Sequence, residues 1–189
     1  MREDVRGIRR MDKLAALVSD ANVLIDIIKA DIDVLRKAAE IYDIYIPYVV
    51  LDEIEQLSEG KAVSLGLKLY EENPALIKEA FGKAGGLSMQ DTVCFETAKK
   101  EGYACLTNDK RLHAKCEAEG ISSIWGLRLI LDLVISNKIS KATAKNTVIK
   151  IKETNTFIKK DVFEDFFINW EKSKCRYWHK GKVRDGPQP

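Results

Sequence analysis

Leu14–Asp20 reads LAALVSD, an apolar run that stops at a serine and an aspartate. A short apolar run bounded by turn-forming residues is typical of a strand that is buried on both faces. Three further runs have the same character, at Ile44–Ile46, Tyr103–Leu106 and Ile121–Ile124. We therefore predict four buried strands, the first of them over Leu14–Val18.

Helical patterns separate these strands along the chain. They span residues 22–41, 48–58, 62–72, 75–82, 89–101, 109–118 and 125–136. Strands that alternate with helices require crossover connections, which produce a parallel sheet covered by helices. The sequence thus predicts an α/β fold with a central parallel sheet of about four to five strands flanked by helices.

The last fifty or so residues have a different pattern, in which strand signals stop and helical signals continue. One helix is predicted to begin at Ser140 and another at Asp161. The second carries an apolar stripe, which is more typical of packing than of a ligand site; it consists of Val162, Phe163, Phe166, Phe167 and Trp170. Residues 172–189 contain six Lys or Arg against a single acid, and two aromatic residues. Such a tail suits either contacts with a nucleic-acid strand or a solvated, flexible end.

We expect four parts along the chain: an N-terminal extension at 1–12, an α/β domain at 13–136, a helical appendage at 137–171 and the basic tail at 172–189. Met11 is an alternative start, which would leave the preceding residues as an extension. Gly82–Gly86 (GKAGG) is predicted to be a loop.

The composition excludes several classes of protein. Against 29 Asp and Glu there are 31 Lys and Arg, a net charge of +2, and 46% of residues are hydrophobic, as in ordinary globular proteins. No apolar run approaches the roughly 20 residues that cross a bilayer, and the N-terminus has no secretory cleavage site, so we expect a cytoplasmic location. The four cysteines match no disulfide framework, and His113 with Cys116 lacks two further zinc ligands.

Two acidic residues follow predicted strands directly. Asp20 comes after the first strand and Asp109 follows the third by two residues. In parallel α/β sheets, the carboxyl ends of the strands are where ligands bind. Both acids, with Asn22 and Asn108 beside them, also suit the N-caps of the following helices.

Glu53 stands in an unusual place for a carboxylate. If residues 48–58 form one helix, Glu53 falls within the apolar stripe of Val49, Val50, Ile54 and Leu57. A carboxylate on a buried face is costly unless it is paired or binds a cation. The alternative is a position at the rim, where the side chain reaches water.

Asp91 repeats this arrangement, because it shares a helical stripe with Leu87, Cys94 and Phe95. It also fits a capping box with Ser88. Four acids converging at one edge of the sheet would repel one another without compensating cations. A site built from carboxylates suits Mg²⁺ or Mn²⁺ better than zinc.

Four segments together resemble the PIN-domain ribonucleases. Val18–Ile25 is similar to the family's opening strand with its acid and asparagine, and Val49–Ile54 to the helix with its glutamate. Leu87–Asp91 and Leu106–Leu112 resemble the third and fourth acidic motifs, in the same order. The resemblance covers roughly residues 13–136. It implies a PIN-like nuclease domain, extended here by the helical C-terminal appendage.

The resemblance implies that Asp20, Glu53, Asp91 and Asp109 are catalytic and hold one or two Mg²⁺ or Mn²⁺ ions, supported by Asn22 and by Thr107 or Asn108. The implied reaction is hydrolysis of RNA phosphodiester bonds to a 5′-phosphate and a 3′-hydroxyl. Candidate RNA contacts are Lys110, Arg111, Lys174, Arg176, Tyr177, Trp178 and Lys180.

Several alternatives stay open. Many members of the family are toxins paired with an antitoxin protein, but they are shorter than this chain. A homodimer would use the apolar faces at 62–82 or 161–170. A PIN-fold module that binds RNA or a protein without cleavage is the main rival. A response-regulator receiver also gathers acids around Mg²⁺, but its arrangement has no place for Glu53.

Overall fold

The computed structural model describes residues 15–82 and 86–155, with Phe163 and Phe166. Its centre is a five-stranded sheet, all parallel, in the order β3-β2-β1-β4-β5. The strands are β1 (Ala16–Ser19), β2 (Asp43–Pro47), β3 (Lys68–Tyr70), β4 (Ala104–Leu106) and β5 (Ser123–Ile124). The predicted α/β fold with a central parallel sheet is therefore confirmed, and four of the strands lie where the apolar runs predicted them.

The strand β3 corrects the predicted helix at 62–72. A short helix, α3 (Glu59–Ser64), ends there, and Gly66 adopts a left-handed conformation with φ +86° that turns the chain. Lys68–Tyr70 then pairs with β2 at the sheet edge. The apolar spacing at 62–72 was misleading because its buried residues do not share one helical face. Ala62 lies in α3, Leu65 at the end of that helix, and Leu67 in the turn that follows.

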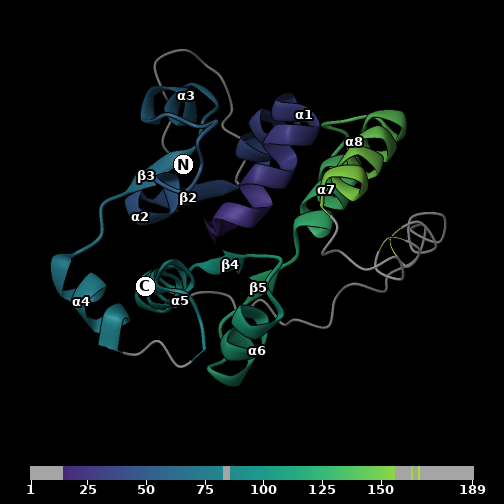
Figure 1. Cartoon of the computed structure of the whole chain (residues 1–189). Coiled ribbons are helices and arrows are strands. Elements are labelled where there is room, and N and C mark those ends of the chain that lie inside the picture. Colours follow the sequence, from purple (N-terminus) through teal and green to yellow (C-terminus); the bar gives the residue numbers. More distant parts are fainter. Residues whose placement is uncertain (1–14, 83–85, 156–162, 164–165, 167–189) are drawn as a thin grey trace, which may run out of the picture.

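Helices cover both sides of the sheet (Figure 1). α1 (Ala21–Ile41) lies on one side, and α5 (Met89–Glu101) and α6 (Lys110–Ala118) lie on the other. The remaining helices are α2 (Tyr48–Leu51), α4 (Pro74–Gly82), α7 (Gly126–Ile135) and α8 (Lys141–Thr154). The core between these layers is apolar, and Leu17, Ile44 and Leu106 within it are fully buried.

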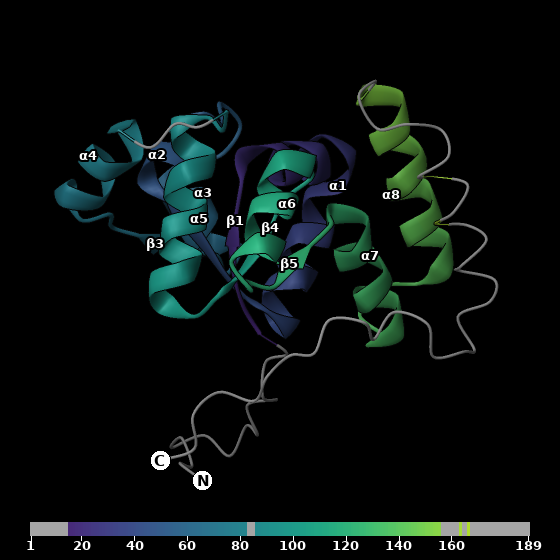
Figure 2. The ribbon, with the colours of Figure 1, turned by 90° about the horizontal axis from the view of Figure 1, so that it is seen from below.

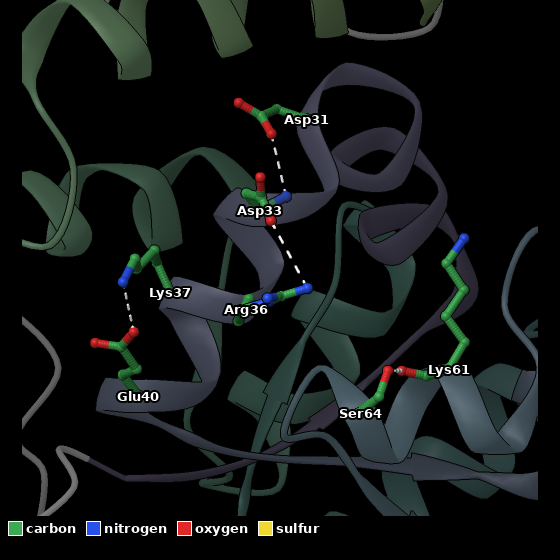
Figure 3. A network of polar contacts seen from close by, with 7 residues as sticks. All are labelled: Asp31, Asp33, Arg36, Lys37, Glu40, Lys61 and Ser64. Carbon is green, nitrogen blue, oxygen red and sulfur yellow. Dashed lines mark hydrogen bonds and ion pairs between the residues drawn. The ribbon is translucent and has the colours of Figure 1, made fainter.

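The long helix α1 is interrupted at Asp31, whose φ of −168° and ψ of 104° are not helical. The Asp31 carboxylate accepts a hydrogen bond from the backbone N–H of Asp33, as an N-cap would, and thereby starts the second half of the helix. Figure 3 shows this contact with exposed ion pairs along the same helix, such as Lys37 with Glu40 at 2.7 Å. Pairs of this kind contribute little to stability because water competes for both charges.

The helix predicted to begin at Ser140 is present as α8, capped by the Ser140 hydroxyl. α8 stands at the edge of the molecule beside α7 and packs on α1 (Figure 2). Its buried residues join the central core, and so do Phe163 and Phe166 of the predicted apolar stripe. The other stripe residues, the helix start at Asp161, the extension 1–12 and the tail 172–189 lie outside the described residues, so these boundaries stay predictions.

Within the described part of the chain, no helix is both long and apolar enough to cross a membrane.

Candidate active site

The sheet reverses its direction of growth between β1 and β4. From β1 the chain builds outward through β2 to β3, and it then returns to place β4 and β5 on the other side. The loops after β1 and β4 therefore diverge at the carboxyl edge of these strands, which is where open parallel sheets bind ligands. Ser19 pairs with Leu106 in register, and the Asp20 N–H donates to the Leu106 carbonyl at 3.0 Å. Asp20 thus lies between β1 and β4, at the point where the strand order reverses, which we call the switch point of the sheet.

Asp20 is a buried carboxylate that also caps α1. One of its oxygens accepts a hydrogen bond from the Val23 N–H at 3.0 Å, and the other accepts one from the Thr107 hydroxyl. The side chain is only 3% exposed. Burial raises its pKa to about 6, with a smaller contribution from the negative charge of Asp91, although the hydrogen bonds act in the opposite direction. The fold thus holds this acid where ionisation is costly.

Asp91 lies on α5, close enough for its charge to raise the pKa of Asp20. The predicted capping box is confirmed. Asp91 N–H donates to the Ser88 hydroxyl at 2.9 Å, and the Asp91 carboxylate accepts from the Ser88 N–H at 3.3 Å. One carboxylate oxygen carries the box. The capping box therefore does not exclude a functional role for Asp91.

Glu53 does not lie on a buried helix face, which corrects the predicted helix at 48–58. α2 ends at Leu51, and the chain continues through tight turns in which the N–H groups of Glu53 and Ile54 bond three residues back. The apolar residues of the stripe still point inward, but Glu53 is exposed at the rim. Partial burial there, together with the charge of Asp91, raises its pKa. The rim alternative was therefore the better interpretation.

The structure brings three of the four predicted acids around one buried thiol. Cys94 of α5 lies beneath the switch point and donates to the Ser19 carbonyl at 3.5 Å. Burial raises the pKa of Cys94 far above its ordinary value, and the charges of Asp20, Asp91 and Glu53 raise it further. Three separate elements thus supply carboxylates to one region, as the order of motifs in the sequence implied.

Asp109 lies outside this group of three acids and is linked to Asp20 through Thr107. It caps α6, and one carboxylate oxygen accepts from the N–H groups of Arg111 and Leu112 at 2.6 and 2.8 Å. Its own N–H donates to the Thr107 hydroxyl at 2.9 Å, and that hydroxyl donates to Asp20. Thr107, fully buried, therefore links the two strand-end acids.

Asn108 braces the same loop from the other side, whereas Asn22 is exposed. The Asn108 side chain donates to Asp26 at 3.1 Å and accepts from the Gly126 N–H at 3.0 Å. Asp26 is buried in α1 and also accepts from Asn155, at the end of α8, at 2.8 Å. Asp26 was not predicted from the sequence, although an acid inside the apolar run Val23–Ile28 was a visible signal.

The predicted RNA contacts are only partly described. Lys110 and Arg111 are exposed at the start of α6, and Arg111 donates to the Gly86 carbonyl at 3.1 Å. Lys174, Arg176, Tyr177, Trp178 and Lys180 lie outside the described residues.

The carboxylate oxygens of this site suit a hard divalent cation, although they do not form a complete set of metal ligands. Between residues 15 and 155, without 83–85, no three His, Cys, Asp or Glu side chains form a group that alone could hold a metal ion. Mg²⁺ commonly binds through one or two carboxylates and completes its shell with water and substrate phosphate. Asp20 and Asp91 satisfy that requirement, because their charges are close and a cation between them would relieve the repulsion.

Parts of the chain are similar to known proteins. Residues 17–100 match the family model of the PIN domain, a stretch that contains Asp20, Glu53 and Asp91 and ends before Asp109. No curated protein matches the chain. Among solved structures, a PilT N-terminus domain protein from the hyperthermophilic archaeon Sulfolobus solfataricus P2 is similar, with 14% identity and a TM-score of 0.46. That alignment covers 62% of this chain and 92% of the other. Over residues 17–100, somewhat less than half of its length, the chain is thus similar to the PIN-domain family.

Proposed function

We propose that this protein is a metal-dependent endoribonuclease. The observation that carries the proposal is the pairing of Asp20 with Asp91 at the switch point of the sheet, where burial and like charge raise the pKa of Asp20 to about 6. Asp91 caps α5, but a cap alone does not explain a second carboxylate beside a buried one, because the repulsion between the two destabilises the fold unless a cation relieves it. The PIN domain matched by residues 17–100 is a nuclease-type fold, which supports the same conclusion.

Asp20 and Asp91 are the residues that would hold Mg²⁺ or Mn²⁺, one or two ions. When bound, the metal supplies a water of lowered pKa and neutralises charge on the phosphate. Thr107 fixes the orientation of the Asp20 carboxylate, and through its second hydrogen bond it also fixes the backbone at Asp109. Glu53 at the rim and Asp109 beside Thr107 would complete the set of acids around the ion, directly or through bound water.

The reaction is hydrolysis in which water attacks phosphorus and the bond to the 3′ oxygen breaks. The attacking water loses one proton and the leaving 3′ oxygen gains one, so the products are a 5′-phosphate and a 3′-hydroxyl. Glu53 is the carboxylate best placed to accept that proton, since it is exposed and its pKa is raised. An antitoxin partner, a homodimer and a cytoplasmic location stay predictions from the sequence.

The test is cleavage of a panel of single-stranded and structured RNAs with Mg²⁺ or Mn²⁺. Asp20→Asn and Glu53→Gln are expected to lose activity, and EDTA is expected to abolish it. Glu55→Gln is the matched control, because Glu55 is exposed two residues from Glu53. The products should carry 5′-phosphates. Undiminished cutting by Asp20→Asn, or by wild type in EDTA, would overturn the metal assignment; RNA binding without any cutting would favour the non-catalytic binding module.

A further inference from the structure

Trp125 immediately follows β5 and is held against the loop that carries Thr107, Asn108 and Asp109. On one side of it, the Thr107 N–H donates to the Ile124 carbonyl at 3.0 Å. On the other, the Gly126 N–H donates to the Asn108 side chain at 3.0 Å. The position of Trp125 is thus tied on both sides to the loop that orients Asp20. β4, β5 and the start of α7 lie together at this end of the sheet (Figure 2).

The indole of Trp125 stacks on the imidazole of His113, with ring centroids 3.6 Å apart and planes 22° from parallel. His113 is itself fixed by two hydrogen bonds, from Nδ1 to the Ser123 hydroxyl at 2.7 Å and from Nε2 to the Thr107 carbonyl at 3.0 Å. A carbonyl can only accept, so Nε2 carries the hydrogen and Nδ1 accepts from Ser123. Burial lowers the pKa of His113, which favours this neutral form. One face of the indole therefore rests on a rigid, uncharged ring.

Trp125 is nevertheless exposed to solvent, at 37%. It is the only exposed aromatic side chain among those that the structure describes. The exposed part of the indole gains nothing for folding, since burial is what makes an aromatic ring stabilising. Trp125 follows β5, which lies two strands from β1 and Asp20 in the sheet, and the exposed Lys110 and Arg111 begin α6, the helix that carries His113. Aromatic rings beside cations are the features that bind single-stranded nucleic acid.

We propose that Trp125 stacks on a base of single-stranded RNA and so holds the neighbouring phosphate at the Asp20 site, an inference that rests on the proposed ribonuclease function. His113 supports the ring from behind and touches no substrate. Stacking does not distinguish bases by their hydrogen-bonding edges, so the contact selects unpaired over paired RNA rather than one sequence.

The expected size of the effect follows from measured stacking contributions. Replacing a stacking aromatic by a residue without a ring costs about 1–3 kcal/mol per base, which corresponds to roughly 5- to 150-fold weaker binding. Because the ring binds substrate and takes no part in bond breaking, KM should rise by this factor while kcat changes little.

The experiment measures binding of a labelled single-stranded RNA by fluorescence anisotropy in EDTA, and steady-state cleavage with Mn²⁺. Trp125→Leu retains an apolar side chain over His113 and should lose affinity, whereas Trp125→Phe should keep most of it. Ile135→Ala is the matched control, because Ile135, the last residue of α7, is also an exposed hydrophobic residue. An oligonucleotide with one abasic position at the contacted base should weaken binding to wild type but not to Trp125→Leu.

The outcomes separate the two proposals. If Trp125→Leu binds and cleaves like Ile135→Ala while Asp20→Asn is inactive, the stacking proposal fails and the nuclease stands. If binding depends on Trp125 and on the base but nothing is cut, the nuclease proposal fails and the stacking contact stands. Wild type that neither binds nor cuts single-stranded RNA overturns both. If the abasic position weakens RNA binding by the same factor in wild type and in Trp125→Leu, stacking is also refuted.

Discussion

Replacing Asp20 by asparagine should stabilise the metal-free protein at neutral pH. The pKa of Asp20 is raised from 3.8 to about 6. Between these two pH values, Asp20 therefore keeps its proton in the folded state but has lost it in the unfolded chain. The stabilising contribution of the protonated acid is complete below pH 3.8 and is lost as the pH rises through about 6. Above that range the ionised acid lowers the free energy of unfolding.

The magnitude follows from the same two values. At 1.36 kcal/mol per pH unit, the difference between 3.8 and about 6 corresponds to about 3 kcal/mol at pH 7.5 and about 1 kcal/mol at pH 4.5. Asparagine carries no charge and caps helices as well as aspartate does, so the hydrogen bond from Val23 can be kept. In a chain of this size, 3 kcal/mol corresponds to a rise in Tm of about 6–12 °C.

The assay is thermal and urea unfolding of both proteins in EDTA at the two pH values. Asp33→Asn serves as the control, because Asp33 is an exposed acid of the same helix, and it should change stability by less than about 0.5 kcal/mol. Added Mg²⁺ should stabilise wild type more than Asp20→Asn, since it binds the ionised site. If Asp20→Asn is no more stable than wild type at pH 7.5, or if its advantage does not shrink at pH 4.5, the argument from burial is wrong.

Three further predictions concern the scaffold. Asn155→Ala removes the amide nitrogen that donates to both oxygens of the buried Asp26 carboxylate, and it should lower the free energy of unfolding by about 1–3 kcal/mol in urea melts. Tyr42→Phe removes the hydroxyl that donates to Asp132 at 2.8 Å, and the same measurement should show a loss in the same range, of about 1–3 kcal/mol. Lys37→Ala breaks an exposed ion pair and should shift the free energy by less than about 0.5 kcal/mol; a larger loss would mean that the pair is stronger than its exposure implies.

Elements with strong local signals were predictable. The strand β1 is an uninterrupted apolar run, and α5 begins at a capping box, so neither depends on distant residues for its recognition. β3 was missed because an edge strand of three residues has too few positions to show alternation, and its neighbour α3 supplies a helical pattern. Its identity comes from pairing with β2, which is a tertiary contact.

The candidate site also contains residues whose positions could be predicted from the sequence and residues whose positions could not. Asp20 and Asp109 could be placed from the sequence because an acid after a buried strand must lie at the strand's carboxyl end. The position of Glu53 could not, since periodicity alone does not show where a helix stops after one turn. The stack of Trp125 on His113 was also invisible, because it joins residues whose proximity depends on the packing of α6 against β5.

The order of the strands also has a consequence for synthesis. Asp20 and Thr107 are 87 residues apart, so the ribosome makes the two halves of this contact at very different times. A growing chain can pair β1 with β2 early, but it gains the loop after β4 only when most of the domain has emerged. For the proposed ribonuclease, this order means that the unfinished chain, still attached to a particle made largely of RNA, has no assembled site with which to cut it.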